Sequence, residues 1–127
     1  MPVGAPPASV WDALIEVLRR ELASERMARA LGCDPAVRSA GFAGAPAQTL
    51  PGFRVVEAEP GRLLDLRGSH RFSRYQLTFR IDSGRIVAET RAAFPGVRGR
   101  IYRALVIGSG AHRIVTRRVL ARVVRRA

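Results

Sequence analysis

The chain of 127 residues contains no lysine, no asparagine and only one cysteine, Cys33. A single cysteine excludes an internal disulfide, so nothing in the sequence requires an oxidising compartment. A lone thiol followed by Asp34 and Pro35 is more typical of a small buried or loop residue than of a nucleophile. Because all 22 basic residues are arginine, the preference resembles the codon bias of a GC-rich genome and says little about the chemistry of any single site.

Long apolar runs are also missing. No run approaches the roughly 18 apolar residues of a membrane span, and Met1 to Pro7 has neither the basic leader nor the apolar core of a signal peptide. We therefore expect a soluble, cytoplasmic protein. With 47% hydrophobic residues, residues 1–127 have enough apolar material for one core, and we predict a single domain.

The sequence offers few groups for catalysis or metal binding. His70 and His112 are its two histidines, and no carboxylate or cysteine stands near either at metal-ligand spacing. We therefore expect neither a metal nor a cofactor. A nucleophile elbow, a phosphate-binding loop and a dinucleotide-binding glycine pattern are all absent from the sequence. No catalytic residue can be assigned from the sequence.

Positive charge, in contrast, is abundant, with a formal net charge of +12. Residues 98–127 hold nine arginines and no acidic residue, whereas residues 1–95 hold thirteen arginines and ten acidic residues. Such a segment attracts phosphates or anionic lipid head groups, so nucleic-acid or anionic-membrane binding is one alternative function. Nucleic-acid binding is disfavoured because the segment has one aromatic residue, Tyr102, and no recognised nucleic-acid-binding module. Membrane binding is disfavoured because the apolar side of this segment is needed for packing against the sheet.

The N-terminal part predicts an amphipathic helix. Its apolar residues recur at i, i+3 and i+4 from Trp11 to Leu22. Ser9 is a good N-cap, and the pattern allows the helix to continue to Leu31, with Gly32 at the position of a C-terminal cap. Residues 34–52 are rich in alanine, glycine, proline and serine, and predict an irregular connection that is able to cover an opening.

A first hairpin is predicted from Phe53–Glu59 and Arg62–Ser69, which flank the turn pair Pro60-Gly61. If those two residues form the whole loop, Glu57 shares an apolar sheet face with Leu66. An unpaired carboxylate on that face is costly, so it needs an arginine partner or a ligand hydroxyl. The alternative is a slipped register, because a proline-first turn matches the strand twist poorly.

A second hairpin is predicted with its turn at Ser83-Gly84, because apolar and polar residues alternate on both sides of this turn. In three of the facing pairs a large residue then meets a smaller one on the apolar side, which gives space that the covering helix fills or that stays open. The predicted facing pairs are Ile81 with Ile86, Phe79 with Ala88, Leu77 with Thr90, and Tyr75 with Ala92.

The last third predicts a long helix from Gly96 to Arg126, with apolar residues on one side and arginines on the other. Gly108-Ser109-Gly110 interrupts it, because two glycines inside a helix cost about 1 kcal/mol each relative to alanine. We expect either a packing kink there or a flexible lip at a cavity entrance. His112 falls on the apolar side, either as a hydrogen-bonded core residue or as a contact to a ligand.

Hairpin strands between two helices indicate an α+β class, in which an antiparallel sheet has one apolar face that a helix must cover. Three stretches, PASVWDAL at 7–14, EPGRL at 59–63 and FPGVRGRIY at 94–102, resemble the helix-grip fold of the SRPBCC superfamily, which includes START domains, Bet v 1-like proteins and polyketide cyclases. They are similar to the start of the first helix, a hairpin and the junction into the last helix in bacterial members.

This resemblance implies an antiparallel sheet wrapped on a long C-terminal helix, with an apolar cavity between them. Members usually have a full strand before the first helix, whereas here Met1 to Gly4 would have to replace it. The resemblance carries no family-wide catalytic residues.

We therefore predict that the protein binds a hydrophobic small molecule between the sheet and the C-terminal helix. The alternative on the same scaffold is a polyketide cyclase or dehydratase, for which Glu57 or His112 would serve as general base. The sequence does not indicate the ligand or the oligomeric state. The predicted ligand-binding residues are Glu57, Leu66, Tyr75, Leu77, Phe79, Thr90, Leu105 and His112.

Overall fold

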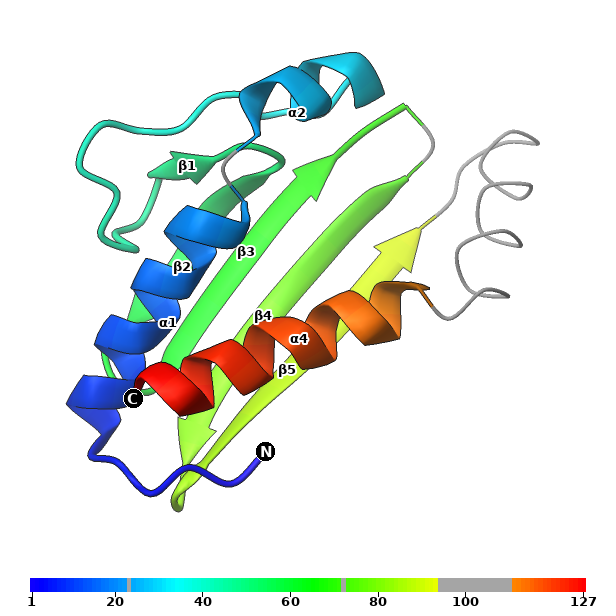
Figure 1. Ribbon diagram of the computed structural model, residues 1–127. Helices are drawn as coiled ribbons and strands as arrows, with labels where there is room; N and C mark the ends of the chain where they lie inside the picture. The colour runs from blue at the N-terminus through cyan, green and yellow to red at the C-terminus, as the bar shows by residue number, and fades with distance from the viewer. Residues whose placement is uncertain (23, 72, 94–110) are drawn as a thin grey trace.

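The computed structural model describes residues 1–22, 24–71, 73–93 and 111–127, and in the last helix it describes side chains from Thr116 onward. Within these residues, five strands form one antiparallel sheet in chain order, and three helices lie beside it (Figure 1). The predicted α+β class is confirmed. None of the helices in the described ranges is long and apolar enough to cross a membrane. The strands are β1 (Thr49–Leu50), β2 (Phe53–Glu59), β3 (Leu63–Ser69), β4 (Arg74–Asp82) and β5 (Arg85–Ala93), and the helices are α1 (Pro7–Glu21), α2 (Glu25–Leu31) and α4 (Ala111–Arg126).

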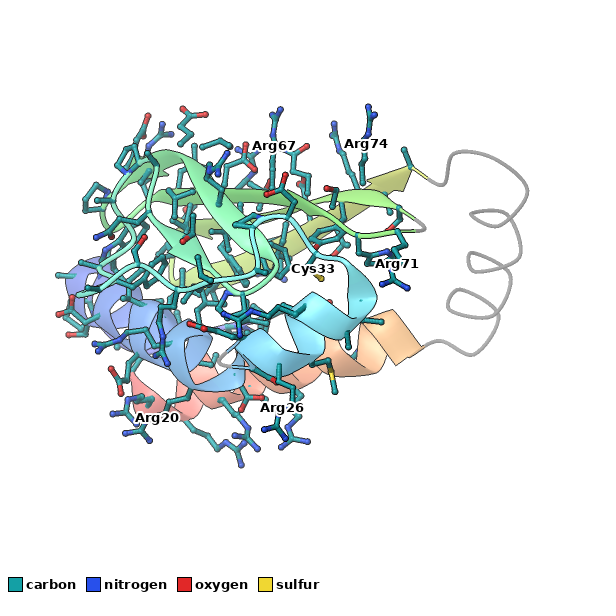
Figure 2. All side chains as sticks on the ribbon, turned by 90° about the horizontal axis from the view of Figure 1, so that it is seen from above. Arg20, Arg26, Cys33, Arg67, Arg71 and Arg74 are labelled. Carbon is teal, nitrogen blue, oxygen red and sulfur yellow. The ribbon has the colours of Figure 1, made fainter. Side chains whose placement is uncertain are left out.

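Helices α1 and α4 lie side by side on one face of the sheet (Figure 1). We call the face that they cover the inner face and the opposite one the outer face. The side chains between the helices and the inner face form one apolar core. Arginines project from both sides of the molecule, with Arg67 and Arg74 on the outer face and Arg20 and Arg26 on the helix side (Figure 2).

Helix α1 begins earlier than predicted. Its first residue is Pro7, its N-cap is Pro6, and no side chain caps it, so the prediction of Ser9 as N-cap is wrong. Proline suits the first helical position because its fixed φ is already helical and its missing N–H has no partner to lose there. The predicted apolar stripe is confirmed, because Trp11, Leu14 and Leu18 are all buried.

A second helix replaces the predicted continuation of the first. Ser24 caps α2 by accepting a hydrogen bond from the backbone N–H of Met27 at 3.1 Å. Gly32 closes α2 with φ of 71°, as expected for a C-terminal cap. The new N-cap starts α2 as a helix of its own, separate from α1.

The first hairpin differs from its prediction by one residue. Glu59 pairs with Leu63, so the loop is Pro60–Arg62, and a β-bulge at Val56 then pairs Val55 with Leu66, as a two-residue loop without a bulge would also do. Between the loop and the bulge every partner is shifted by one. Glu57 therefore lies opposite Asp65 on the outer face, and its predicted place on the apolar face is wrong. The longer loop relieves the poor match between a proline-first turn and the strand twist.

The second hairpin has the predicted register throughout. Ser83 and Gly84 form the turn with φ of 49° and 72°, which is the conformation that two-residue hairpin loops require. Tyr75 pairs with Ala92, and the intervening pairs follow as predicted. Met1 to Gly4 lies beside the start of β5, where Pro2 bridges to Arg85 and the N–H of Val3 donates to the carbonyl of Gly84 at 2.8 Å.

Helix α4 has 16 residues, and residues 96–110 of the longer predicted helix lie outside the described part. Val119 and Val123 are buried against the rest of the core. Arg122 forms an ion pair with Glu21 of α1, and Arg117 is exposed. For the side chains described, the predicted division into an apolar and a basic side is confirmed.

Candidate functional site

An apolar pocket of about 220 Å³ lies between α2, the end of α1, the β1–β2 turn and the start of β4. We call it the α2 pocket. Met27 and Leu31 of α2 are 64% and 39% exposed beside it, so the pocket is continuous with exposed apolar side chains. Its lining residues are Glu21, Leu22, Ser24, Met27, Ala28, Leu31, Cys33, Pro51, Gly52, Phe53, His70 and Tyr75.

Tyr75 connects the sheet to the turn that borders this pocket. Its hydroxyl donates a hydrogen bond to the carbonyl of Gly52 at 2.6 Å and lies 3.9 Å from the sulfur of Cys33. Its ring meets the ring of Phe53 edge-on, with centroids 5.1 Å apart. Gly68, the β3 partner of Tyr75, leaves the room that this arrangement needs, because a side chain there would collide with the Gly52 carbonyl and the Tyr75 ring.

His70 is a half-buried titratable group of the α2 pocket. Its Nε2 lies 3.1 Å from the hydroxyl of buried Ser73, and its ring centroid lies 5.6 Å from that of Tyr75. Burial lowers the pKa of His70 from its ordinary value of 6.5, because removing the ring from water disfavours the charged form. The pocket therefore favours a neutral imidazole, which can both donate and accept a hydrogen bond.

This lowered pKa makes stability depend on pH. The unfolded chain takes up the proton near pH 6.5, whereas the folded chain takes it up at a lower pH. The contribution of His70 to stability is therefore fully present above its pKa in the unfolded chain. It is lost as the pH falls through 6.5 toward the lower pKa of the folded chain. We expect the Tm to fall from about pH 7 to about pH 5 by more in the unchanged protein than in His70→Gln, as measured by circular dichroism. An equal fall in both proteins would contradict this assignment.

Of the eight residues predicted to contact a ligand, Tyr75 lines the α2 pocket. Leu66 and Phe79 are buried in the core, with 0% and 1% of their surface exposed, and Leu77 packs against that core. Thr90 is exposed on β5. The middle of the inner face, predicted to border a cavity, is thus occupied by core side chains.

The polar candidate Glu57 does not line the α2 pocket. Glu57 is exposed on the outer face, because the bulge at Val56 turns it away from the core. Leu105 and the side chain of His112 lie outside the described residues, so their predicted contacts stay predictions. No group of three histidine, cysteine, aspartate or glutamate residues in the described ranges could hold a metal ion.

Sequence reasoning missed most of the pocket wall. Met27, Leu31 and Phe53 were assigned to a helix continuation and a strand, and Cys33 and His70 were each considered alone. Their meeting depends on the angle between α1 and α2, which apolar periodicity does not reveal. The one available signal was Ser24 followed by Glu25, a combination that starts a helix.

Comparisons of the chain with protein-family models, with curated proteins and with solved structures each found no match.

Proposed function

We propose that the protein binds a small apolar molecule in the α2 pocket. The observation that carries this proposal is a mostly apolar hollow that leaves Met27 and Leu31 exposed beside it. Methionine adapts its shape to different partners and makes favourable contacts with aromatic rings. The hydroxyl of Tyr75, the imidazole of His70 and the thiol of Cys33 supply the few polar groups that orient a ligand in such sites.

The size of the pocket limits the ligand. Its 220 Å³ is below the range of roughly 300–1,000 Å³ that is usual for drug-sized ligands. The occupant would therefore be a compact molecule, or one end of a longer molecule. In the helix-grip arrangement that the sequence resembles, a longer C-terminal helix would add contacts, and Leu105 and His112 remain the candidates for them.

The α2 pocket lacks the carboxylate that the sequence suggested as general base. The carboxylate predicted as general base, Glu57, lies on the other side of the sheet. A general base must come within hydrogen-bond reach of the proton that it removes. The cyclase or dehydratase alternative therefore keeps His112 as its candidate base.

Filling the pocket tests this proposal. Ala28 of α2 is 6% exposed and lines the pocket, whereas Ala30 of the same helix is exposed. We expect Ala28→Leu to weaken binding of an apolar fluorescent probe by about tenfold or more, because the added side chain occupies the ligand space. Ala30→Leu, with the same chemical change, should leave probe binding unchanged.

Native mass spectrometry of the purified protein provides a second measurement. A co-purifying apolar compound present in the unchanged protein and in Ala30→Leu but missing from Ala28→Leu would support the proposal. Equal probe affinity in all three proteins would show that the α2 pocket is not the binding site.

A further inference from the structure

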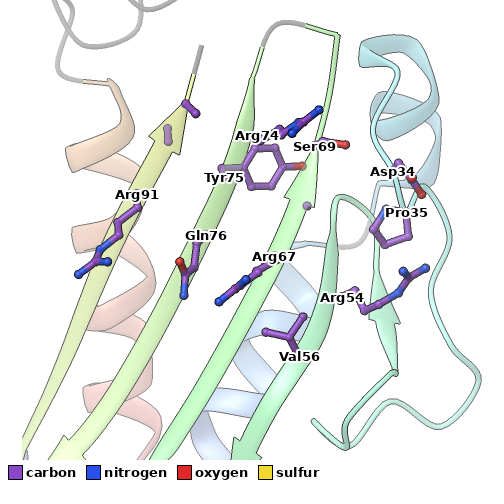
Figure 3. A pocket seen from close by; sticks show the side chains of 13 residues that line it. Asp34, Pro35, Arg54, Val56, Arg67, Ser69, Arg74, Tyr75, Gln76 and Arg91 are labelled. Carbon is purple, nitrogen blue, oxygen red and sulfur yellow. The ribbon is translucent and has the colours of Figure 1, made fainter. Parts of the chain in front are cut away.

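Three arginines and a glutamine form one row across the outer face of the sheet. Arg54 of β2 pairs with Arg67 of β3, Arg67 pairs with Gln76 of β4, and Gln76 pairs with Arg91 of β5 (Figure 3). Neighbouring strands are about 4.8 Å apart, so these side chains share a small area. Like charges directly opposite each other destabilise a sheet. Folding alone therefore does not favour this arrangement.

A buried carboxylate lies next to the middle of the row. Asp65 is 6% exposed and accepts hydrogen bonds from Nε2 of Gln76 at 2.9 and 3.0 Å and from the hydroxyl of Thr78 at 3.3 Å. The guanidinium of Arg67 lies 3.6 Å from the same carboxylate. Asp65 thus positions the amide of Gln76 and attracts the exposed guanidinium of Arg67 before any ligand arrives.

Three other arginines in or beside this row have no carboxylate partner among the described residues. Arg54, Arg74 and Arg91 form no ion pair with any residue in the described part of the chain, and all three are exposed. Arg74 belongs to the same face, two positions before Gln76 on β4. The charge of these three side chains is therefore available to a ligand.

These residues line a groove, which we call the arginine groove, with a volume of about 560 Å³. That volume lies in the range of small-molecule sites. Asp34 is the one acidic residue among four arginines in its lining, so the wall has a net formal charge of +3. Including Asp65, which lies next to the arginine row, lowers the net formal charge to +2. A ligand that neutralises the groove needs at least two negative charges.

An acidic row limits the shape of that ligand. One step along the strands, Glu57 lies opposite Asp65, Asp65 opposite Thr78 and Thr78 opposite Glu89. An anion that extended along the strands in this direction would meet these carboxylates, whereas Arg74 lies on the opposite side of the arginine row. The favoured position is therefore across the strands, over the arginines, and the favoured ligand is compact.

We propose that the arginine groove binds a compact ligand with two or more phosphate groups. The planar guanidinium group matches the geometry of phosphate and donates two parallel hydrogen bonds to it. A nucleic acid is less suited, because Tyr75, the one aromatic residue in the described lining of the groove, stands at an inner-face position of β4 and packs its ring against Phe53. A flat anionic membrane would also have to approach the acidic row.

Calorimetric titration with tripolyphosphate at low salt tests this proposal. We expect Arg67→Gln and Arg91→Gln each to weaken binding by about tenfold, because each removes hydrogen bonds to a charged group. Arg26→Gln is the matched control, since Arg26 is exposed on the helix side, away from the groove (Figure 2). It changes the net charge by the same amount and should leave the affinity unchanged.

Three further ligands identify the source of the phosphate. Inorganic phosphate should bind at least about tenfold more weakly than tripolyphosphate, because it reaches fewer guanidinium groups. A single-stranded oligonucleotide and vesicles containing phosphatidylserine should both bind more weakly than tripolyphosphate under the same conditions. Stronger binding of either one would overturn the compact-ligand proposal in favour of a macromolecular partner.

Two other results would also overturn the proposal. One is the absence of tripolyphosphate binding to the unchanged protein, and the other is an equal loss of affinity in Arg26→Gln. Thermal unfolding without ligand shows whether each variant is folded. Arg54→Gln is a third groove variant, and it should remain folded. It removes one side of the Arg54–Arg67 pair of like charges and should therefore not lower the Tm.

Discussion

Replacing Phe79 with alanine is expected to lower the free energy of unfolding by about 3–5 kcal/mol. Phe79 is the largest fully buried side chain of the described residues, with 1% of its surface exposed, and it belongs to the cluster that joins the sheet to α1 and α4. Truncation removes its apolar contacts and leaves a cavity that the surrounding close-packed side chains cannot fill completely. Urea unfolding followed by circular dichroism measures the change, and the m-value should stay constant.

Thr90→Ala is the control for this experiment. Thr90 was predicted with Phe79 to border a ligand cavity, but it is exposed on β5, so its truncation should change stability by no more than about 0.5 kcal/mol. A loss below about 1 kcal/mol for Phe79→Ala, combined with weaker binding of an apolar probe, would contradict the packed core. It would instead support a ligand cavity between the sheet and the helices.

Gly68→Ala is expected to lower the free energy of unfolding by about 1–3 kcal/mol, because it adds an atom where there is no room. A Cβ at this position meets the carbonyl of Gly52 and the ring of Tyr75. The turn must then move away from β3, which separates the Tyr75 hydroxyl from the Gly52 carbonyl that accepts its hydrogen bond. Urea unfolding should show the lower stability, and the apolar probe should bind the α2 pocket more weakly.

Gly4→Ala provides the comparison for this substitution. No atom lies within 4 Å of a Cβ built at Gly4, so the same chemical change should alter stability by no more than about 0.5 kcal/mol. If Gly68→Ala were as stable as Gly4→Ala, the close approach of the β1–β2 turn to β3 would be wrong. The β1–β2 turn would then not form this part of the wall of the α2 pocket.

The two hairpins show how much of the sheet could be predicted from the sequence. In the second hairpin, the alternation is long and the turn Ser83-Gly84 has the conformation of a two-residue loop, so each constraint supports the other. In the first hairpin, an extra loop residue and a bulge compensate for each other. Leu66 was therefore placed correctly on the apolar face, whereas Glu57 was placed on the wrong face.

The candidate sites were harder to predict because both depend on contacts between distant segments. The α2 pocket needs the N-cap at Ser24, which starts a helix in a new direction, and the β1–β2 turn, whose composition predicts only irregular structure. The arginine groove needs three strand registers at once. Arg54, Arg67 and Arg91 were each recognisable as polar-face residues, but their alignment in one row follows only from the complete sheet.

The single thiol of the chain is placed where an optical reporter would be most informative. Cys33 is half-buried in the wall of the α2 pocket, near the Tyr75 hydroxyl. Because the sequence has no other cysteine, a thiol-directed dye attaches at this position alone. Protection of this thiol from the dye by an apolar probe would therefore test, in the native sequence, whether the probe reaches the pocket wall.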